Sequence, residues 1–140
     1  MERLDILDST LRDGSQGENI SFSVNDKLNI ARLLDGLGVA YIEAGNPASN
    51  PKDREFFEKA AGLFLRHARL VAFGSTRKPH AAAEEDEGLA ALLAAGVETA
   101  AIFGKASAFH VERVLRTSRE ENLRMVEDSV RFLKARGLAV

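Results

Sequence analysis

The strongest local signal in the sequence is the segment Leu7-Asp8-Ser9-Thr10-Leu11-Arg12-Asp13-Gly14-Ser15-Gln16-Gly17. It follows a short apolar run and passes at once into charged residues and glycine, which predicts a buried strand over residues 1–7 that ends in a loop. Gly14 and Gly17 permit the sharp turns of such a loop. Arg12 and Asp13 lie just past the strand end, where α/β enzymes hold catalytic side chains on a rigid support that is open to ligand. An Arg–Asp pair that only ties the loop down would give the same spacing.

Outward from this segment, the chain repeats the order strand, loop, helix four times. Strands are expected to begin near residues 3, 39, 70 and 97, and a fifth begins at residue 138. Helix N-termini are predicted at Ser23, Asn50 and Ser118, each a capping residue followed by apolar residues at helical spacing. Each helix is expected to bury one face. The four faces carry Leu28, Ala31, Leu34 and Leu37; Phe56, Phe57, Ala60, Leu63 and Phe64; Leu89, Leu92 and Leu93; and Leu123, Val126, Val130 and Leu133. The second strand, residues 39–42, is expected to deliver Glu43 at its end.

Alternating strands and helices of this kind imply a parallel sheet. No Gly-x-Gly-x-x-Gly pattern follows the first strand, which counts against a dinucleotide-binding sheet. Polar residues follow each strand instead, which fits an α/β barrel whose site lies at the carboxyl ends of the strands. A complete (β/α)8 TIM barrel takes about 250 residues. We therefore expect residues 1–140 to form its first four βα units, the N-terminal half of one catalytic domain.

The composition excludes several classes of protein. A net charge of -2 gives no reason to expect a nucleic acid or a membrane surface as a partner. The absence of cysteine excludes disulfides and thiolate metal sites. No apolar run approaches the ~20 residues of a membrane span, and no basic-then-apolar leader opens the chain, so a cytoplasmic protein is expected. The acidic run Glu84–Glu87 is interpreted as the solvated start of a helix rather than as a metal cluster.

The opening segment resembles the signature of the aldolase-type TIM-barrel metalloenzymes, Asp-Thr-Thr-Leu-Arg-Asp-Gly-x-Gln, with Ser9 in place of the middle threonine. This family includes the citramalate, 2-isopropylmalate and homocitrate synthases and 3-hydroxy-3-methylglutaryl-CoA lyase. Further blocks are similar to the citramalate-synthase branch; they are residues 17–23, 49–53, 73–77, 102–105, 110–111 and 120–123. Asn46 and Ala48 depart from the Trp and Gly of that branch.

The resemblance implies an acyltransferase with a pyruvate carboxyltransferase-like domain. Such enzymes condense acetyl-CoA with a 2-oxo acid, here pyruvate to give citramalate, in branched-chain amino-acid biosynthesis. Arg12 then matches the arginine that stabilises charge on the keto oxygen, and Asp13 matches a carboxylate ligand of a divalent metal (Mg²⁺, Mn²⁺ or Zn²⁺). Gln16 matches a polar neighbour of these two, and Glu43 an acidic residue that pairs with Arg12 or helps proton transfer.

Two further residues are expected to contact substrate. His110 resembles a histidine in the loop after the fourth strand of the synthases, and Arg77 could reach a carboxylate or a CoA phosphate. The other metal ligands of the family are spaced His-x-His, whereas this chain has only His67, His80 and His110, no two of them close in sequence. Residues 1–140 alone are therefore expected to be inactive.

Several alternatives remain open at this point. A larger 2-oxo acid would make the protein a 2-isopropylmalate or homocitrate synthase, and the same Arg and metal would serve a lyase that cleaves a 3-hydroxyacyl-CoA. A non-catalytic half-barrel that acts as an interaction module is a third possibility. The expected partners are acetyl-CoA and a 2-oxo acid, with no nucleic acid and no membrane. Because half a barrel leaves sheet edges and an apolar face open, a homodimer is also expected.

Overall fold

The structure is a computed structural model, and it describes residues 4–140. Its centre is a four-stranded sheet in the order β1-β2-β3-β4, in which every neighbouring pair is parallel. The strands are β1 (Leu7–Asp8), β2 (Tyr41–Gly45), β3 (Arg69–Ser75) and β4 (Thr99–Phe103). A parallel sheet in strict chain order is the arrangement of the first half of an α/β barrel, as the sequence predicts.

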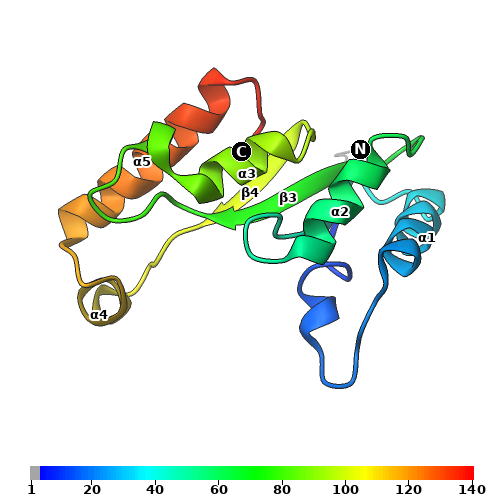
Figure 1. Cartoon of the computed structure of the whole chain (residues 1–140), viewed down its shortest axis with the longest axis horizontal. Helices are drawn as coiled ribbons and strands as arrows, with labels where there is room; N and C mark the ends of the chain where they lie inside the picture. Colours follow the sequence, from blue (N-terminus) through cyan, green and yellow to red (C-terminus); the bar gives the residue numbers. More distant parts are fainter. Residues whose placement is uncertain (1–3) are drawn as a thin grey trace.

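Helices connect the strands and cover one face of the sheet. They are α1 (Val24–Gly36), α2 (Pro51–Ala60), α3 (Glu87–Ala94) and, after β4, α5 (Arg119–Ala135). Shorter elements are η1 (Gly14–Gln16), η2 (Ala83–Glu85), α4 (Ala108–His110) and the π-helical turn η3 (Val111–Leu115). Figure 1 shows α2 and α3 in front of β3 and β4, with α5 beside α3 and the small α4 set apart beyond the end of β4. In the described part of the chain, no helix is long and apolar enough to cross a membrane.

The predicted helix starts are confirmed by their caps. Ser23 and Asp26 form a full capping box, in which the Asp26 N–H donates to Ser23 Oγ at 3.1 Å and the Ser23 N–H donates to Asp26 Oδ2 at 2.8 Å. Asn50 Oδ1 accepts from the Lys52 N–H at 3.0 Å, with Pro51 at the first helical position. These local interactions fix where each helix begins, and therefore how long each βα loop is.

The first strand differs from its prediction. Residues 1–3 lie outside the described residues, and β1 consists only of Leu7 and Asp8. Within residues 4–140, β1 pairs with β2 alone, and Leu4 and Ile6 are 88% and 63% exposed. The apolar run correctly indicated a strand. The predicted burial of Leu4 and Ile6 is not found, because among the described residues no segment packs over them.

The core lies between the sheet and the helices. Strand residues that point outward, such as Ile42, Ala72 and Ala100, are buried against apolar side chains of the helices; those are chiefly Ala31, Phe56, Phe57, Leu89, Leu92 and Leu133. The predicted stripe of α2 extends too far, because the helix ends at Ala60 and Phe64 is 82% exposed. Gly74 of β3 leaves room for Leu92, whose side chain would lie 3.0 Å from an added Cβ.

The last helix is rotated relative to its predicted face. Leu133 is buried as expected, but Leu123 is 68% exposed and Val126 is 37% exposed. The residues that face the core instead include Met125, Ser129 and Phe132. Ser129 accepts a hydrogen bond from the backbone of the loop after β3, so the side of α5 that carries Ser129 faces that loop.

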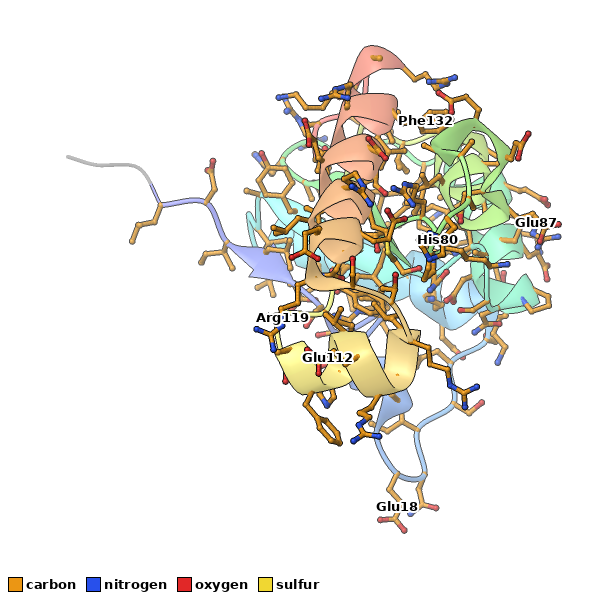
Figure 2. The ribbon with its side chains drawn as sticks, turned by 90° about the vertical axis from the view of Figure 1, so that its left-hand side faces the viewer. Glu18, His80, Glu87, Glu112, Arg119 and Phe132 are labelled. Carbon is orange, nitrogen blue, oxygen red and sulfur yellow. The ribbon has the colours of Figure 1, made fainter. Side chains whose placement is uncertain are left out.

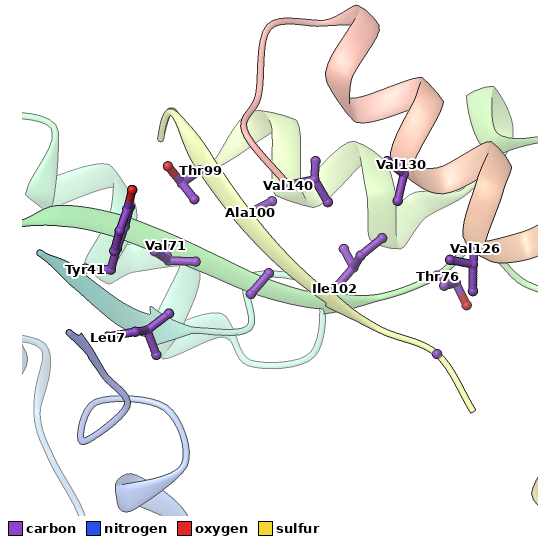
Figure 3. Close-up of a pocket in the computed structure, with 12 residues that line it drawn as sticks. Leu7, Tyr41, Val71, Thr76, Thr99, Ala100, Ile102, Val126, Val130 and Val140 are labelled. Atoms are coloured by element: carbon purple, nitrogen blue, oxygen red, sulfur yellow. The ribbon is translucent and has the colours of Figure 1, made fainter. Parts of the chain in front are cut away.

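A fifth strand begins where the sequence predicts it. The Ala139 N–H donates to Glu98 O, and the Ala100 N–H donates to Ala139 O, both at 2.9 Å, in a parallel bridge with Thr99. Beside this bridge a hollow of ≈ 470 Å³ follows β4, and Figure 3 shows it between Leu7 and Tyr41 at one end and Val126 on α5 at the other. The hollow is mostly apolar, and its lining comes from the strands on one side and from α5 on the other.

Candidate active site

The loop after β1 is anchored on both sides of Arg12. Asp8 accepts from the Thr10 N–H at 2.9 Å and from the Thr10 hydroxyl at 3.1 Å, which closes a tight turn directly after the strand. Leu11 is completely buried in the core, and the Arg12 N–H donates to Ser9 O at 3.1 Å. The backbone therefore presents the Arg12 side chain from a fixed point above the carboxyl end of the sheet.

Arg12 lies between two carboxylates. Its Nε donates to Glu43 Oε2 at 2.6 Å, and its Nη1 donates to Asp13 Oδ1 at 2.9 Å. Its Cζ lies 4.0 Å from the ring centroid of Phe73. Among the residues that the structure describes, Nη2 has no hydrogen-bond partner, so this nitrogen can still donate to a ligand.

Glu43 comes from the inner face of β2. It lies within the strand, beside Val71 of β3, and not after the strand end as the sequence suggested, because β2 continues to Gly45. Its side chain is only 6% exposed, and Arg12 is its ion-pair partner. Glu43 therefore fixes the Arg12 side chain from the inner face of β2.

Asp13 is the exposed member of the cluster. Its side chain is 64% exposed, and only its Oδ1 is engaged by Arg12. An open carboxylate oxygen on a loop is a suitable single ligand for a hard divalent cation, which prefers oxygen donors. Residues 4–140 contain no group of three or more His, Cys, Asp or Glu side chains placed to hold a metal ion. The described residues thus fit one ligand of a metal site and not a complete one.

The other expected substrate-binding residues lie apart from this cluster. Gln16 is exposed in η1, immediately beyond the Arg12 loop. His110 is exposed at the end of α4, with its ring centroid 6.0 Å from that of Phe109. Figure 2 shows Glu112 and Arg119 close together where η3 approaches α5. Their side chains form an ion pair at 2.9 Å, which connects η3, directly after His110, to the start of α5.

Arg77 lies in a buried network and does not face the Arg12 cluster. Its guanidinium pairs with Glu121 at 2.7 Å and with Asp128 at 2.8 Å, and its backbone N–H donates to Ser129 Oγ at 2.8 Å. Glu121 accepts hydrogen bonds from the Arg77 side chain and from the His80 N–H. Together they outweigh the cost of burial and lower the pKa of Glu121 to about 2. Arg77 was expected to reach a carboxylate or a CoA phosphate, and its guanidinium is here engaged by carboxylates of the chain itself. Its donors join the β3 loop to α5.

Sequence reasoning missed two groups around the site. Phe73 contacts Arg12 from β3, and its only sequence signal is an aromatic residue near the end of a strand. Lys27 and Asp53 form a buried ion pair at 2.5 Å, and Asp53 Oδ2 also accepts from the Asn46 N–H at 2.8 Å, directly after β2. The signal for Lys27 is its position on the same helical side as Val24 and Ala31, where a lysine is unexpected.

Comparison with known proteins assigns the chain to a family. A family model described as HMGL-like matches residues 3–140. The chain belongs to the HMGL-like family. Within that family it is 53% identical, over 137 residues, to (R)-citramalate synthase of Sulfolobus acidocaldarius, covering 98% of this chain and 26% of that protein. It is 36% identical, over 135 residues, to homocitrate synthase of Methanopyrus kandleri, covering 96% of this chain and 32% of that protein.

The HMGL-like fold is also found among solved structures. The crystal structure of the HMG-CoA lyase of Bacillus subtilis superimposes with a TM-score of 0.72 at 23% sequence identity, covering 97% of this chain and 44% of that one. This likeness supports the barrel fold. The chain spans about a quarter of the length of the citramalate synthase that it matches.

Proposed function

We propose that the protein carrying this chain is an acyltransferase of the (R)-citramalate synthase type, which condenses acetyl-CoA with pyruvate. The arrangement of Arg12 between Glu43 and Asp13, at the carboxyl end of the sheet, is the observation that carries the proposal. The identity of 53% to a citramalate synthase, against 36% to a homocitrate synthase, favours pyruvate over a larger 2-oxo acid.

Arg12 stabilises the negative charge that develops on the keto oxygen during carbon–carbon bond formation. Its guanidinium is always charged, and two of its nitrogens are already bonded to carboxylates. The free Nη2 is therefore held in one direction before substrate arrives, so little reorganisation is needed when charge appears. Glu43 keeps the guanidinium in this orientation from the inner face of β2.

Asp13 is the proposed contact to a divalent metal, through the carboxylate oxygen that Arg12 leaves open. Such a cation, when bound, polarises the keto group and orients the 2-oxo acid. Gln16 and His110 remain proposed substrate contacts on the loops after β1 and β4. Arg77 is left out of the proposed site, because Glu121 and Asp128 already use its guanidinium.

The test is an assay of the complete gene product for release of free CoA from acetyl-CoA. Pyruvate should support turnover, with citramalate identified by mass, and larger 2-oxo acids should support much less. Arg12→Lys should lower it strongly and Asp13→Asn should abolish it, whereas Arg32→Lys, on the exposed face of α1, should do neither. Preference for a larger 2-oxo acid would identify an isopropylmalate or homocitrate synthase. Cleavage of a 3-hydroxyacyl-CoA would identify a lyase, and no turnover with any of these substrates would favour an interaction module.

We also propose that the 140-residue chain on its own forms a homodimer. Leu4, Ile6 and Leu7 at the β1 edge are 88%, 63% and 49% exposed, and the hollow along β4 is mostly apolar. Exposed apolar surface of this kind favours association with a second copy. Light scattering over a dilution series should show a dimer that Ile6→Lys converts to a monomer and that Leu37→Lys, at the end of α1, leaves intact. A monomer at all concentrations would contradict this proposal.

A further inference from the structure

The inner face of the sheet carries two stacked aromatic rings beside the Arg12 cluster. Phe73 of β3 and Phe103 of β4 lie with their ring centroids 5.4 Å apart and their planes 12° from parallel. Arg12 Cζ is 4.0 Å from the Phe73 centroid, and Lys105 Nζ is 5.3 Å from the Phe103 centroid. Since β3 lies between β1 and β4 in the sheet, Arg12 and Phe103 approach Phe73 from opposite sides.

These two rings are not explained by packing of the core. The hydrophobic core between sheet and helices includes neither Phe73 nor Phe103, and Phe103 is 41% exposed. Among the described residues, packing of the sheet against the helices does not account for two parallel rings next to a charged cluster. The contact with the guanidinium supplies a reason, because the face of an aromatic ring attracts a cation and a planar guanidinium stacks on it well.

We propose that Phe73 is a positioning residue for Arg12. Glu43 holds Nε and Asp13 holds Nη1, but a side chain as long as arginine can keep such bonds while its plane tilts. The Phe73 ring covers one face of the guanidinium, fixes that plane and keeps water from it. Phe103 holds the Phe73 ring from the opposite side. Nη2, which has no hydrogen-bond partner among the described residues, then remains open to a ligand, and the ring determines its direction.

The consequence for catalysis rests on the proposed condensation, whereas the consequence for Arg12 itself does not. The ring should act mainly on the transition state, since the orientation of Nη2 matters most when charge develops on the keto oxygen. Loss of the ring should therefore lower kcat and leave the KM for the 2-oxo acid little changed. Loss of a substrate contact would instead raise KM.

The first test is spectroscopic and needs no activity. In the complete gene product labelled with ¹⁵N-arginine, the Arg12 Nε–H signal is assigned by its loss in Arg12→Lys. We expect it to be shifted upfield by the Phe73 ring and to exchange slowly with water. Phe73→Leu should abolish both properties and Phe73→Tyr should retain them. Lys105→Met, which removes only the cation over Phe103, should leave both unchanged. An Arg12 signal that is the same in wild type and Phe73→Leu would overturn the proposal.

The second test is kinetic. Phe73→Leu should lower kcat about tenfold, which corresponds to the loss of one well-desolvated cation–π contact. Phe73→Tyr should restore most of it, and the urea midpoint of Phe73→Leu should match that of wild type, which excludes a folding defect as the cause. Unchanged kcat in Phe73→Leu would overturn the catalytic consequence. If the Arg12 signal responds as expected but the wild type turns over none of the tested substrates, the positioning role stands and the proposed function fails.

Discussion

Arg77 Nη1 and Glu121 Oε1 lie 2.7 Å apart, and each side chain is only 5% exposed. The pair links the loop after β3 to the first turn of α5. Glu121 also accepts from the backbone N–H of His80 at 2.9 Å, so one carboxylate holds two separate points of that loop. The orientation of α5 against the sheet depends on this arrangement.

Stability should fall in acid because of Glu121. Its pKa is lowered from 4.5 to about 2 in the folded chain, chiefly by Arg77, so the unfolded chain binds the proton more readily. The pair therefore stabilises the fold fully above pH 4.5, and this contribution is lost as the pH falls toward 2. Urea denaturation between pH 3 and pH 6 should show a steeper loss of stability for wild type than for Glu121→Gln. Glu127→Gln, in an exposed pair with Arg131, should behave like wild type.

Replacement of Arg12 should affect the rate more than binding. Arg12→Ala should lower kcat by on the order of 10²–10³, the usual cost of losing one donor to a developing oxyanion. Affinity for a divalent cation should change much less, since Asp13 and not Arg12 is the proposed ligand. Steady-state kinetics and a metal titration on the same preparation check both expectations. Near wild-type turnover would assign Arg12 a structural role.

Removal of one member of the Lys27–Asp53 pair should be costly. Lys27 is 2% exposed, and Lys27→Met leaves the buried Asp53 carboxylate without its cation. The loss should be about 3–5 kcal/mol in the free energy of unfolding. Lys27→Met combined with Asp53→Asn should recover part of it, because no uncompensated charge remains. Equilibrium urea denaturation of the two variants and wild type measures this difference, and an equal loss in both variants would argue against a charge effect.

Asp35 should stabilise the connection between α2 and β3. Burial alone would raise its pKa, but hydrogen bonds from the backbone N–H groups of Arg66, Ala68 and His67, at 2.8–2.9 Å, outweigh it and lower the pKa below 3.8. Asp35→Ala should cost roughly 1–3 kcal/mol by leaving these donors without an acceptor. Hydrogen exchange of the three amides should become faster in this variant. Unchanged exchange would show that the Asp35 carboxylate does not protect these amides.

Features of the fold that depend on residues close together in the sequence could be predicted. Ser23 and Asn50 mark helix starts because their partners lie two or three residues away, and the alternation of strands and helices gives the parallel sheet. The rotation of α5 could not be predicted, since apolar residues favoured the face with Leu123. The face that is buried carries Ser129, whose partner Arg77 lies far away in the chain.

In the candidate site, too, residues within a local motif could be predicted, whereas contacts between distant parts of the chain could not. The motif around Arg12 and Asp13 located the cluster, and the structure brings Glu43 to it. Phe73 was missed because its contact with Arg12 joins distant parts of the chain, and no local pattern encodes it. Arg77 looked similar to a ligand-binding residue because sequence does not show how many carboxylates surround a guanidinium.

The close approach of Gly45 and Asp53 restricts how this protein can evolve. Gly45 has φ +149, and a Cβ there would overlap the Asp53 carboxylate, so no other residue is accepted at position 45 while Asp53 is present. A smaller residue at position 53 would remove the overlap but leave Lys27 buried without its partner. A substitution of Lys27, Gly45 or Asp53 alone is therefore selected against while the other two residues are unchanged. Such epistasis predicts that in homologues Lys27 and Asp53 are kept or replaced together, whereas Gly45 is kept in either case because of its positive φ.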